Sequence, residues 1–252
     1  MSSPQMDSLI KKIDEFESDL LNALEFKYKQ FYGKNWQKIL EHHPMSQMSI
    51  KEFAESYAEQ TSYPHDRIQK LVYLLFDFKI ELFFILELDM GLYNHLIYNL
   101  GYDDSSIVDK PYILLRRLSL DQTVILKSRI LWERTMNFVY FLETGVELEV
   151  SGRESKKAKF FKLIRDNRWS FLLDYKDYID WFDDKLRTPE VHKSSTLRKS
   201  FQDGSRPPSE KIHAFTNVIM NVFWGNMLSI VKGNEPPIRY WDVGISNRSK
   251  YL

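Results

Sequence analysis

The sequence predicts an all-α protein, built as an antiparallel helical bundle with an N-terminal helical extension. Only nine glycines and nine prolines occur in 252 residues, and they cluster at few places. In the long intervals between them, apolar residues recur with helical spacing and do not alternate as they would in a strand. We expect helices near residues 6–32, 49–61, 65–98, 119–143, 154–166, 169–186, 189–201 and 209–232.

Two of these helices are predicted to form the core. The segment Ile68–Leu88 is apolar nearly all round, which is typical of a central helix. The next core helix is expected to begin at Ser119-Leu120-Asp121 and to end at Thr144-Gly145, where glycine provides a stop. The uncharged run Ala214–Val231 contains three asparagines, which are costly in hydrocarbon, so a buried helix is favoured over a membrane span.

The domain organisation follows from length and proline content. A chain of 252 residues is long enough for one large domain or for a small domain fused to a larger one. We expect an N-terminal helical extension over 1–62, either separate or part of the same domain, and a helical bundle over 63–233. Pro236 and Pro237 predict an extended C-terminal tail over 234–252.

Composition excludes several classes of protein. Lysine and arginine total 35, as do aspartate and glutamate, so no global charge favours nucleic acid or a membrane surface. The lack of cysteine excludes a disulfide framework and thiolate metal sites, and it fits a cytoplasmic protein. The N-terminus has no signal-peptide pattern. Only Glu210 and His213 have the Glu-x-x-His spacing, so one chain cannot complete a di-iron site, and we expect no metal and no cofactor.

The segment Arg187-Thr188-Pro189-Glu190-Val191-His192 is the strongest candidate for a functional site. Threonine is a preferred N-cap, proline suits the first helical position, and glutamate suits the first turn. With Thr188 as the cap, Arg187 would lie just outside a helix and His192 in about its first turn. Backbone amides, a fixed cation and a group that titrates near neutral pH would then converge where a phosphate could bind.

The same residues have a plainer interpretation. His192 can be an exposed residue of a first turn, and Arg187 can pair with Asp183 or Asp184. An arginine followed by a histidine after four to six residues is expected roughly once by chance in a chain of this composition. The spacing occurs a second time at Arg206-to-His213, so spacing alone does not decide the matter.

In its residues and helix order, the segment Ile68–Lys232 resembles the HEPN superfamily of all-α nucleotide-binding and ribonuclease domains. The hallmark of the active members is an arginine, four to six residues and a histidine at the junction of two late helices. Arg187 and His192 match it with four intervening residues. Thr188 departs from the pattern, because active members often carry Asn, Asp or His there. Active members also often carry an acidic residue on an earlier helix, for which Glu133 is the candidate; its other interpretation is a solvent-facing partner of a Lys or Arg.

This resemblance implies a metal-independent endoribonuclease of a bacterial toxin or antiviral-defence type. His192 would be the general acid or base, Arg187 would stabilise the transition state, and Thr188 and Lys193 would contact RNA beside them. One histidine is poorly equipped for both proton transfers, and the family pairs two motifs in one groove of a homodimer. An antitoxin or other protein partner is also implied. The alternative is a catalytically silent HEPN-like module that binds nucleotide, RNA or a protein.

Charge separates sharply in the second half of the chain. Residues 153–168 hold seven cations against two carboxylates, a net charge of +5, and the next predicted helix has a net charge of −3. Such a basic segment can follow an RNA backbone through phosphate contacts, for which the candidates are Lys156, Lys157, Lys159 and Lys162. The alternatives are a solvated helix face, or pairing of the basic segment with the acidic one.

Overall fold

The fold is described from a computed structural model. It describes residues 4–32, 34, 37, 49–60, 64–94, 111–150, 154–188, 198, 199, 223 and 225–234. The predicted helix 189–201, except for residues 198 and 199, most of the predicted helix 209–232, and the tail beyond residue 234 lie outside this part. His192 and Lys193 lie outside it as well.

The regular elements of the described residues are all helical, which confirms the all-α class. In chain order they are α1 (Pro4–Tyr32), α3 (Ile50–Gln60), α4 (His65–Asn94), α5 (Pro111–Thr144), α6 (Lys156–Ile164), the 3₁₀ turn η4 (Ser170–Tyr175), α7 (Lys176–Phe182), the π-helical turn η5 (Asp183–Arg187) and α11 (Gly225–Val231). None of these described helices combines the length and the apolar composition that a membrane span needs.

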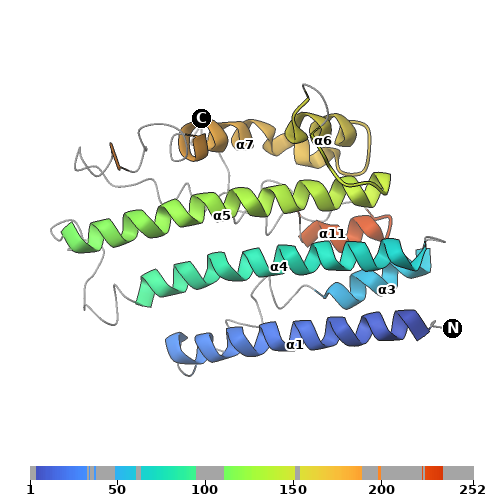
Figure 1. The fold of residues 1–252 in the computed structure, drawn as a ribbon, viewed down its shortest axis with the longest axis horizontal. Helices are drawn as coiled ribbons and strands as arrows, with labels where there is room; N and C mark the ends of the chain where they lie inside the picture. The colour runs from blue at the N-terminus through green and yellow to red at the C-terminus, as the bar shows by residue number, and fades with distance from the viewer. Residues whose placement is uncertain are drawn as a thin grey trace.

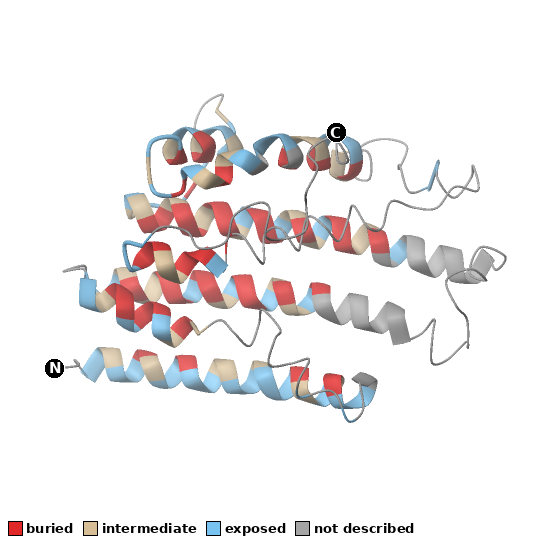
Figure 2. Cartoon of the chain, turned by 180° about the vertical axis from the view of Figure 1, so that it is seen from behind, coloured by how far each residue is buried: buried red, intermediate tan, exposed pale blue. Residues whose placement is uncertain are grey.

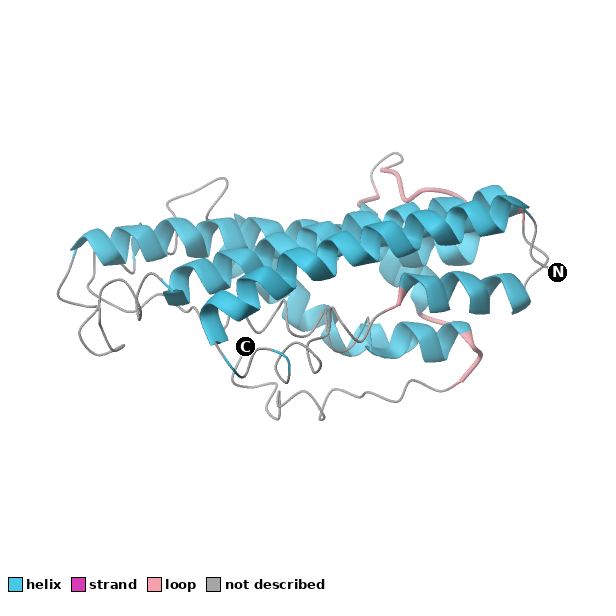
Figure 3. Cartoon of the chain, turned by 90° about the horizontal axis from the view of Figure 1, so that it is seen from below, coloured by secondary structure: helices cyan, strands magenta, loops and turns pink. Residues whose placement is uncertain are grey.

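Three long helices, α1, α4 and α5, lie side by side as one layer (Figure 1). The short helices α3 and α11 cover one face of this layer (Figure 3), and α6, η4 and α7 follow the outer edge of α5. The helices α4 and α5 are antiparallel, as expected for the bundle. Helix α1 instead runs parallel to α4, because α3, which lies between them in the chain, runs in the opposite direction. Helices α1 and α4 are in contact: Phe16 stacks on Phe76 with ring centres 4.1 Å apart, and Glu17 pairs with Lys79.

An aromatic cluster fills the space between the long helices and the covering helices. Phe53 of α3 lies 5.5 Å from Phe138 of α5, ring centre to ring centre, and Phe223 lies 5.6 Å from Phe78, 5.9 Å from Phe138 and 5.9 Å from Trp169. All five of these residues are buried. The buried positions of α4 and α5 recur along each helix, as the colours of Figure 2 show. Aromatic rings bury the largest apolar areas per residue, so this cluster fixes α3 and the α11 region against α4 and α5.

The start of α5 differs from the prediction. It begins at Pro111, so Ser119 lies within the helix, where its carbonyl accepts a hydrogen bond from Thr123 Oγ1 at 2.9 Å. Serine costs little inside a helix, whereas proline is favoured in the first turn, so the true start carries the stronger signal. Asp121, which was expected in the first turn, is buried at 1 % exposure.

The end of α5 is where the sequence predicts it. Gly145 adopts φ +77°, and its N–H donates to the Phe141 carbonyl at 2.8 Å. A Cβ at this position would lie 3.0 Å from the Arg67 guanidinium, which donates a hydrogen bond to the Leu142 carbonyl. The predicted stop at Thr144-Gly145 is therefore confirmed, and it also gives α4 a contact with the last turn of α5.

The predicted helix 169–186 is interrupted: it consists of η4, α7 and η5 in succession. Trp169, which is fully buried, precedes η4, and its indole N–H donates to Glu143 Oε1 at 2.7 Å. Arg168 donates to the same oxygen at 2.9 Å. Arg168 and Trp169 are both bonded to Glu143 near the end of α5, and the tight 3₁₀ turn η4 follows them. The regular α-helix therefore starts only at Lys176.

Buried charges connect α1 and α3 to α4. Glu17 Oε1 accepts hydrogen bonds from the Ile50 backbone N–H at 2.8 Å and from Lys79 Nζ at 2.6 Å. The Lys79 side chain is 3 % exposed, and this burial lowers its pKa from the ordinary value although Glu17 opposes the shift. One carboxylate thus determines where α3 begins and how α1 lies on α4.

Removing the Lys79 charge alone should therefore destabilise the protein. Lys79→Met leaves the Glu17 carboxylate buried without its counterion, which costs about 3 kcal/mol of unfolding free energy. The double variant Glu17→Gln/Lys79→Met removes both charges and keeps an acceptor for the Ile50 N–H, so it should recover most of that loss. Urea unfolding of both variants measures this, and an equally unstable double variant would contradict the explanation.

Candidate functional site

Thr188 does not begin a helix. Its backbone is helical, with φ −64° and ψ −44°, and its N–H donates to the Asp183 carbonyl five residues earlier. An N-cap has non-helical, typically extended backbone, so the prediction that Thr188 is an N-cap is wrong. The helical backbone instead runs from α7 through η5 to Thr188, and Arg187 lies at its end.

The end of this segment is a π-helical turn. Such turns are rare in proteins, and those that occur often lie at functional sites. Within it, Leu186 is buried together with Phe182 of the preceding turn, and Asp183 is only 7 % exposed. The turn therefore places a carboxylate and two apolar side chains against the bundle while Arg187 follows at the edge. A buried carboxylate in this position requires counterions.

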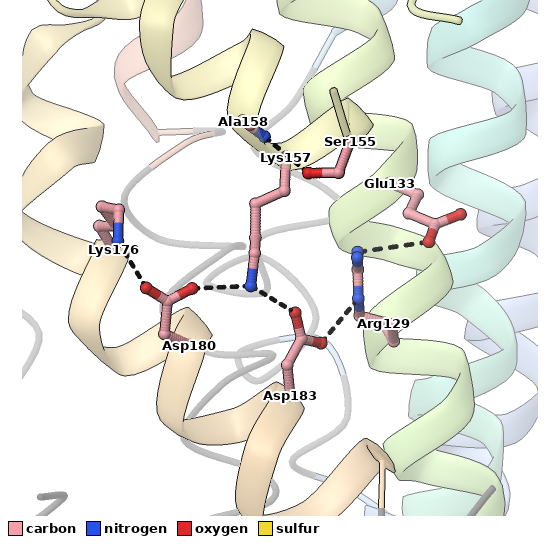
Figure 4. Close-up of polar contacts among 8 residues, drawn as sticks. All are labelled: Arg129, Glu133, Ser155, Lys157, Ala158, Lys176, Asp180 and Asp183. Carbon is pink, nitrogen blue, oxygen red and sulfur yellow. Dashed lines mark hydrogen bonds and ion pairs between the residues drawn. The ribbon is translucent and has the colours of Figure 1, made fainter. Parts of the chain in front are cut away.

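Two cations hold the Asp183 carboxylate (Figure 4). Arg129 Nε of α5 lies 2.8 Å from Oδ1, and Lys157 Nζ of α6 lies 3.0 Å from Oδ2. The Arg129 N–H is not aligned with the oxygen, so this contact is an ion pair without a hydrogen bond. Asp183 thus connects three elements, α5, α6 and η5, at one point.

The ion pairs continue on both sides of Asp183. Lys157 Nζ also lies 2.7 Å from Asp180, which pairs with Lys176 at 2.6 Å, and Arg129 lies 3.4 Å from Glu133. Partial burial alone would raise the pKa of Asp180, but hydrogen bonds from Lys157 and Lys176 outweigh it and hold that pKa below its ordinary value. Burial likewise lowers the pKa of Lys157, but its two carboxylate partners raise it above the ordinary value.

The basic segment is therefore partly used within the fold. Lys157 pairs with the acidic segment, as the alternative interpretation expects, and Lys159 donates to the Glu149 carbonyl at 2.7 Å. Lys156 and Lys162 are exposed and have no ion pair within the described part of the chain. RNA contact by any of the four lysines stays a prediction.

Arg187 pairs with neither Asp183 nor Asp184 in the structure. Its plainer interpretation pairs it with Asp183 or Asp184, but Asp183 is held by Arg129 and Lys157. Arg187 itself is half-buried and forms no ion pair with any residue that the structure describes. An arginine that stays charged at every working pH and has no internal carboxylate can bind a phosphate group through two parallel hydrogen bonds.

Glu133 lies beside the same network but away from Arg187. The helix α5 and the α7–η5 segment run in opposite directions (Figure 1). Glu133 is four residues from Arg129 and Arg187 is four residues from Asp183, so the two lie on opposite sides of the ion pair, about 12 Å apart along the bundle axis. The Glu133 side chain is 46 % exposed and pairs with Arg129. A catalytic role for Glu133 stays a prediction that this position does not favour.

Arg129 is a residue of this region that sequence reasoning missed. It links Glu133 to Asp183 and is 13 % exposed. The signal is faint: a cation with a carboxylate four residues later, within a helix that carries several other charged residues. Within the described residues, no group of histidines and carboxylates is arranged to hold a metal ion.

No protein-family profile, curated protein or solved structure matches this chain. The all-α class thus rests on the structure, and the resemblance to the HEPN superfamily rests on the sequence motif. His192, the second half of that motif, lies outside the described residues.

The Asp180 pairs predict how stability depends on pH. Because the folded pKa of Asp180 is lowered, the unfolded state binds more protons between the two pKa values, so stability rises with pH there. Wild type should exceed Asp180→Asn in melting temperature above about pH 4, and the difference should vanish as the pH falls through the folded pKa. Thermal melts from pH 2.5 to 7 measure it.

Asp184→Asn is the matched control, because Asp184 is exposed and has no ion pair with the described residues. A difference between wild type and Asp180→Asn that is the same at every pH would contradict the ion-pair explanation.

Proposed function

We propose that the protein is a metal-independent endoribonuclease in which Arg187 binds the scissile phosphate. One observation carries the proposal: Asp183, a buried carboxylate four residues before Arg187, forms its ion pairs with Arg129 and Lys157, and Arg187 has no ion pair with the described residues, so we assign Arg187 to an external anion. The π-helical turn that presents Arg187 is a second support, since such turns are enriched at functional sites.

The reaction follows from the two residue types. The 2′-hydroxyl loses its proton and its oxygen attacks phosphorus, the bond to the 5′-oxygen breaks, and the leaving oxygen gains a proton. The products are a 2′,3′-cyclic phosphate and a 5′-hydroxyl end. Arg187 would stabilise the extra negative charge at phosphorus, and His192 would transfer a proton as general acid or base. Thr188 and Lys193 would contact the RNA beside it.

The proposal extends the HEPN resemblance to biological role. A bacterial toxin or antiviral effector of this type would have an antitoxin or another protein partner that restrains it. It would also need a second proton-transfer group, which the family obtains from a second copy.

The second candidate is a catalytically silent module of the same kind that binds nucleotide, RNA or a protein. Two observations favour it: Thr188, where active members often carry Asn, Asp or His, has helical backbone and caps no helix, and Lys157 is neutralised by Asp180 and Asp183. Such a module would bind phosphate through Arg187 but would not cleave RNA.

The purified protein is expected to cleave RNA in the presence of a chelator. Because Arg187 and His192 supply the charge and the proton transfer, Arg187→Ala and His192→Ala should each lower the cleavage rate at least 100-fold, in line with the loss of one electrostatic or acid–base group. Gel analysis of a structured RNA with EDTA present measures it, and end-group analysis should find 2′,3′-cyclic phosphate.

Lys12→Ala is the control, since Lys12 is an exposed cation of α1 outside both the motif and the basic segment. Circular dichroism confirms that each variant folds. Equal cleavage by wild type and both motif variants would refute the ribonuclease, and RNA binding without cleavage would favour the silent module.

One double and one single lysine variant separate RNA contact from structure. Lys156→Gln/Lys162→Gln removes two exposed cations, so it should weaken RNA binding alike for all sequences. It should also make the plot of log affinity against log salt shallower by about 1.5 to 2 units. Lys157→Gln breaks two internal ion pairs, so it should lower the melting temperature.

Fluorescence anisotropy over 50–300 mM salt measures the slope, and a thermal melt measures stability. An unchanged slope in the Lys156/Lys162 variant would exclude this helix as an RNA track.

A further inference from the structure

One face of the long-helix layer is covered by none of the described helices. The helices α3 and α11 both lie on the opposite face, and among the described elements none lies on this one (Figures 1 and 3). We call it the open face and define it by α4 residues 73–84 and α5 residues 126–137. The sequence predicts Ile68–Leu88 as a central helix that is apolar nearly all round, and α4 does lie between α1 and α5; its apolar side chains on this face are partly exposed.

Large apolar side chains line the open face. Each is between 36 % and 43 % exposed: Tyr73, Ile80 and Phe84 on α4, and Leu126 and Ile130 on α5. Tyr73, Ile80 and Phe84 are seven and four residues apart and so lie on one stripe of α4, and Leu126 and Ile130 lie on one stripe of α5. Together they expose on the order of 400 Å² of mostly apolar surface, the size of a patch that is often functional.

The charges of the open face are segregated by helix. Helix α4 contributes carboxylates, Asp77 and Glu81, whereas α5 contributes the cations that pair with them. Asp77 lies 3.5 Å from Arg134, and Glu81 lies 2.9 Å from Lys127. Asp77 and Arg134 are 50 % and 41 % exposed, so each can meet a further opposite charge.

These two ion pairs also fix the register of α4 against α5. Position 77 is level with position 134 and position 81 with position 127, so Ile80 is level with Ile130. Phe84 is level with Lys127, whose Nζ lies 4.8 Å from the centre of the Phe84 ring. Apolar residues therefore face each other at equal heights, and so do opposite charges.

We propose that the open face binds the open face of a second copy of this chain. A twofold axis parallel to the helices, between α4 and α5, places α4 of one copy over α5 of the other at the same height. Ile80 then lies over Ile130 of the second copy, and Asp77 over its Arg134. The four helices form an antiparallel four-helix core in which every helix has opposite charge on both neighbours.

Charge decides between this packing and its main rival. A twofold axis perpendicular to the helices would place α4 over α4, which brings Asp77 and Glu81 near their own copies. Like charges at a dry interface are costly, so that arrangement is disfavoured. Glu133 is the carboxylate on the α5 side of the described face, and Arg129 neutralises it within the chain.

The size of the patch suits the centre of such an interface. A standard interface buries about 800 Å² per partner, with an apolar centre and a charged rim. The apolar stripes supply the centre, and the charged flanks of α1 and α5 supply the rim.

This dimer differs from the shared-groove dimer that the family resemblance implies. The rotation that places α4 over α5 carries α7 and η5 of the two copies to opposite edges of the assembly (Figure 1). Each Arg187 then remains at an outer edge. The dimer proposal goes beyond the ribonuclease proposal, and either can fail without the other.

Because the chain has no cysteine, single cysteines report the packing directly. Ile80→Cys and Ile130→Cys proteins are mixed in equal amounts, allowed to exchange subunits and oxidised mildly. The mixture should give a disulfide between position 80 of one chain and position 130 of the other, identified by peptide mapping. Disulfides formed chiefly between two copies of Ile80→Cys would overturn the proposed axis.

The oligomeric state gives the second test. Wild-type protein should sediment as a dimer at micromolar concentration, and Ile80→Glu or Ile130→Glu should raise the dimer dissociation constant at least 100-fold. Phe26→Glu is the control: Phe26 is 70 % exposed on α1, outside the open face, and its change should have less than a 3-fold effect. A wild type that stays monomeric at 100 μM, or a dimer unaffected by both face variants, would overturn the proposal.

Discussion

The arrangement depends on the antiparallel pair α4 and α5. Every other described element packs on one of these two helices or on a helix that does: α1 and α3 contact α4, and α6 and η5 contact α5. Gly145 and Arg67 connect the last turn of α5 to the start of α4, and the two ion pairs of the open face fix their register. Contacts at the middle and at one end hold this pair of long helices together as a rigid frame. The short helices are stabilised by the apolar side chains that they bury against this frame.

Attachment to this frame uses buried charge as well as apolar contact. Glu17 and Lys79 position α1 and the start of α3, and Asp183 positions η5 through cations from two other elements. Buried ion pairs add little net stability compared with apolar side chains of the same size, but an unpaired member is costly. Their effect here is on geometry. Glu17 contacts the start of α3 and Lys79 of α4, and Asp183 contacts cations of α5 and α6, so each of these carboxylates favours one register of the helix that bears it. Arg187 is left out of this pairing, and that exclusion gives the candidate site its chemistry.

Local signals in the sequence were sufficient to predict most helices, because apolar spacing and the Gly145 stop act within a few residues. Three features required the tertiary structure. The break at 170–187 arises from Trp169 and Arg168 bonding to Glu143, which is distant in sequence. The helical backbone of Thr188 arises from a π-helical turn held by the buried Asp183, although its sequence context is that of a cap. The open face arises because the described covering helices lie on one side only. For the site, the sequence places Arg187 just outside a helix, whereas the structure has it in the π-helical turn, and its role stays a prediction. The partner of Glu133 and the role of Lys157 depend on Arg129 and Asp183, which no local pattern connects.

The net charge of the chain is zero, but the fold distributes the charged side chains unevenly over the surface. Basic and acidic segments that are adjacent in sequence fold against each other, and their inner members, Lys157 with Asp180 and Asp183, cancel. Cations that remain outside this cancellation, such as Lys156, Lys162 and Arg187, lie around the α6–η5 edge, while the carboxylates and cations of the open face are matched in pairs across α4 and α5. An uncancelled edge attracts an anion, and a face with matched charges and apolar stripes fits a copy of itself. The two surfaces therefore differ in chemistry and in position, so the two proposals concern separate parts of the molecule.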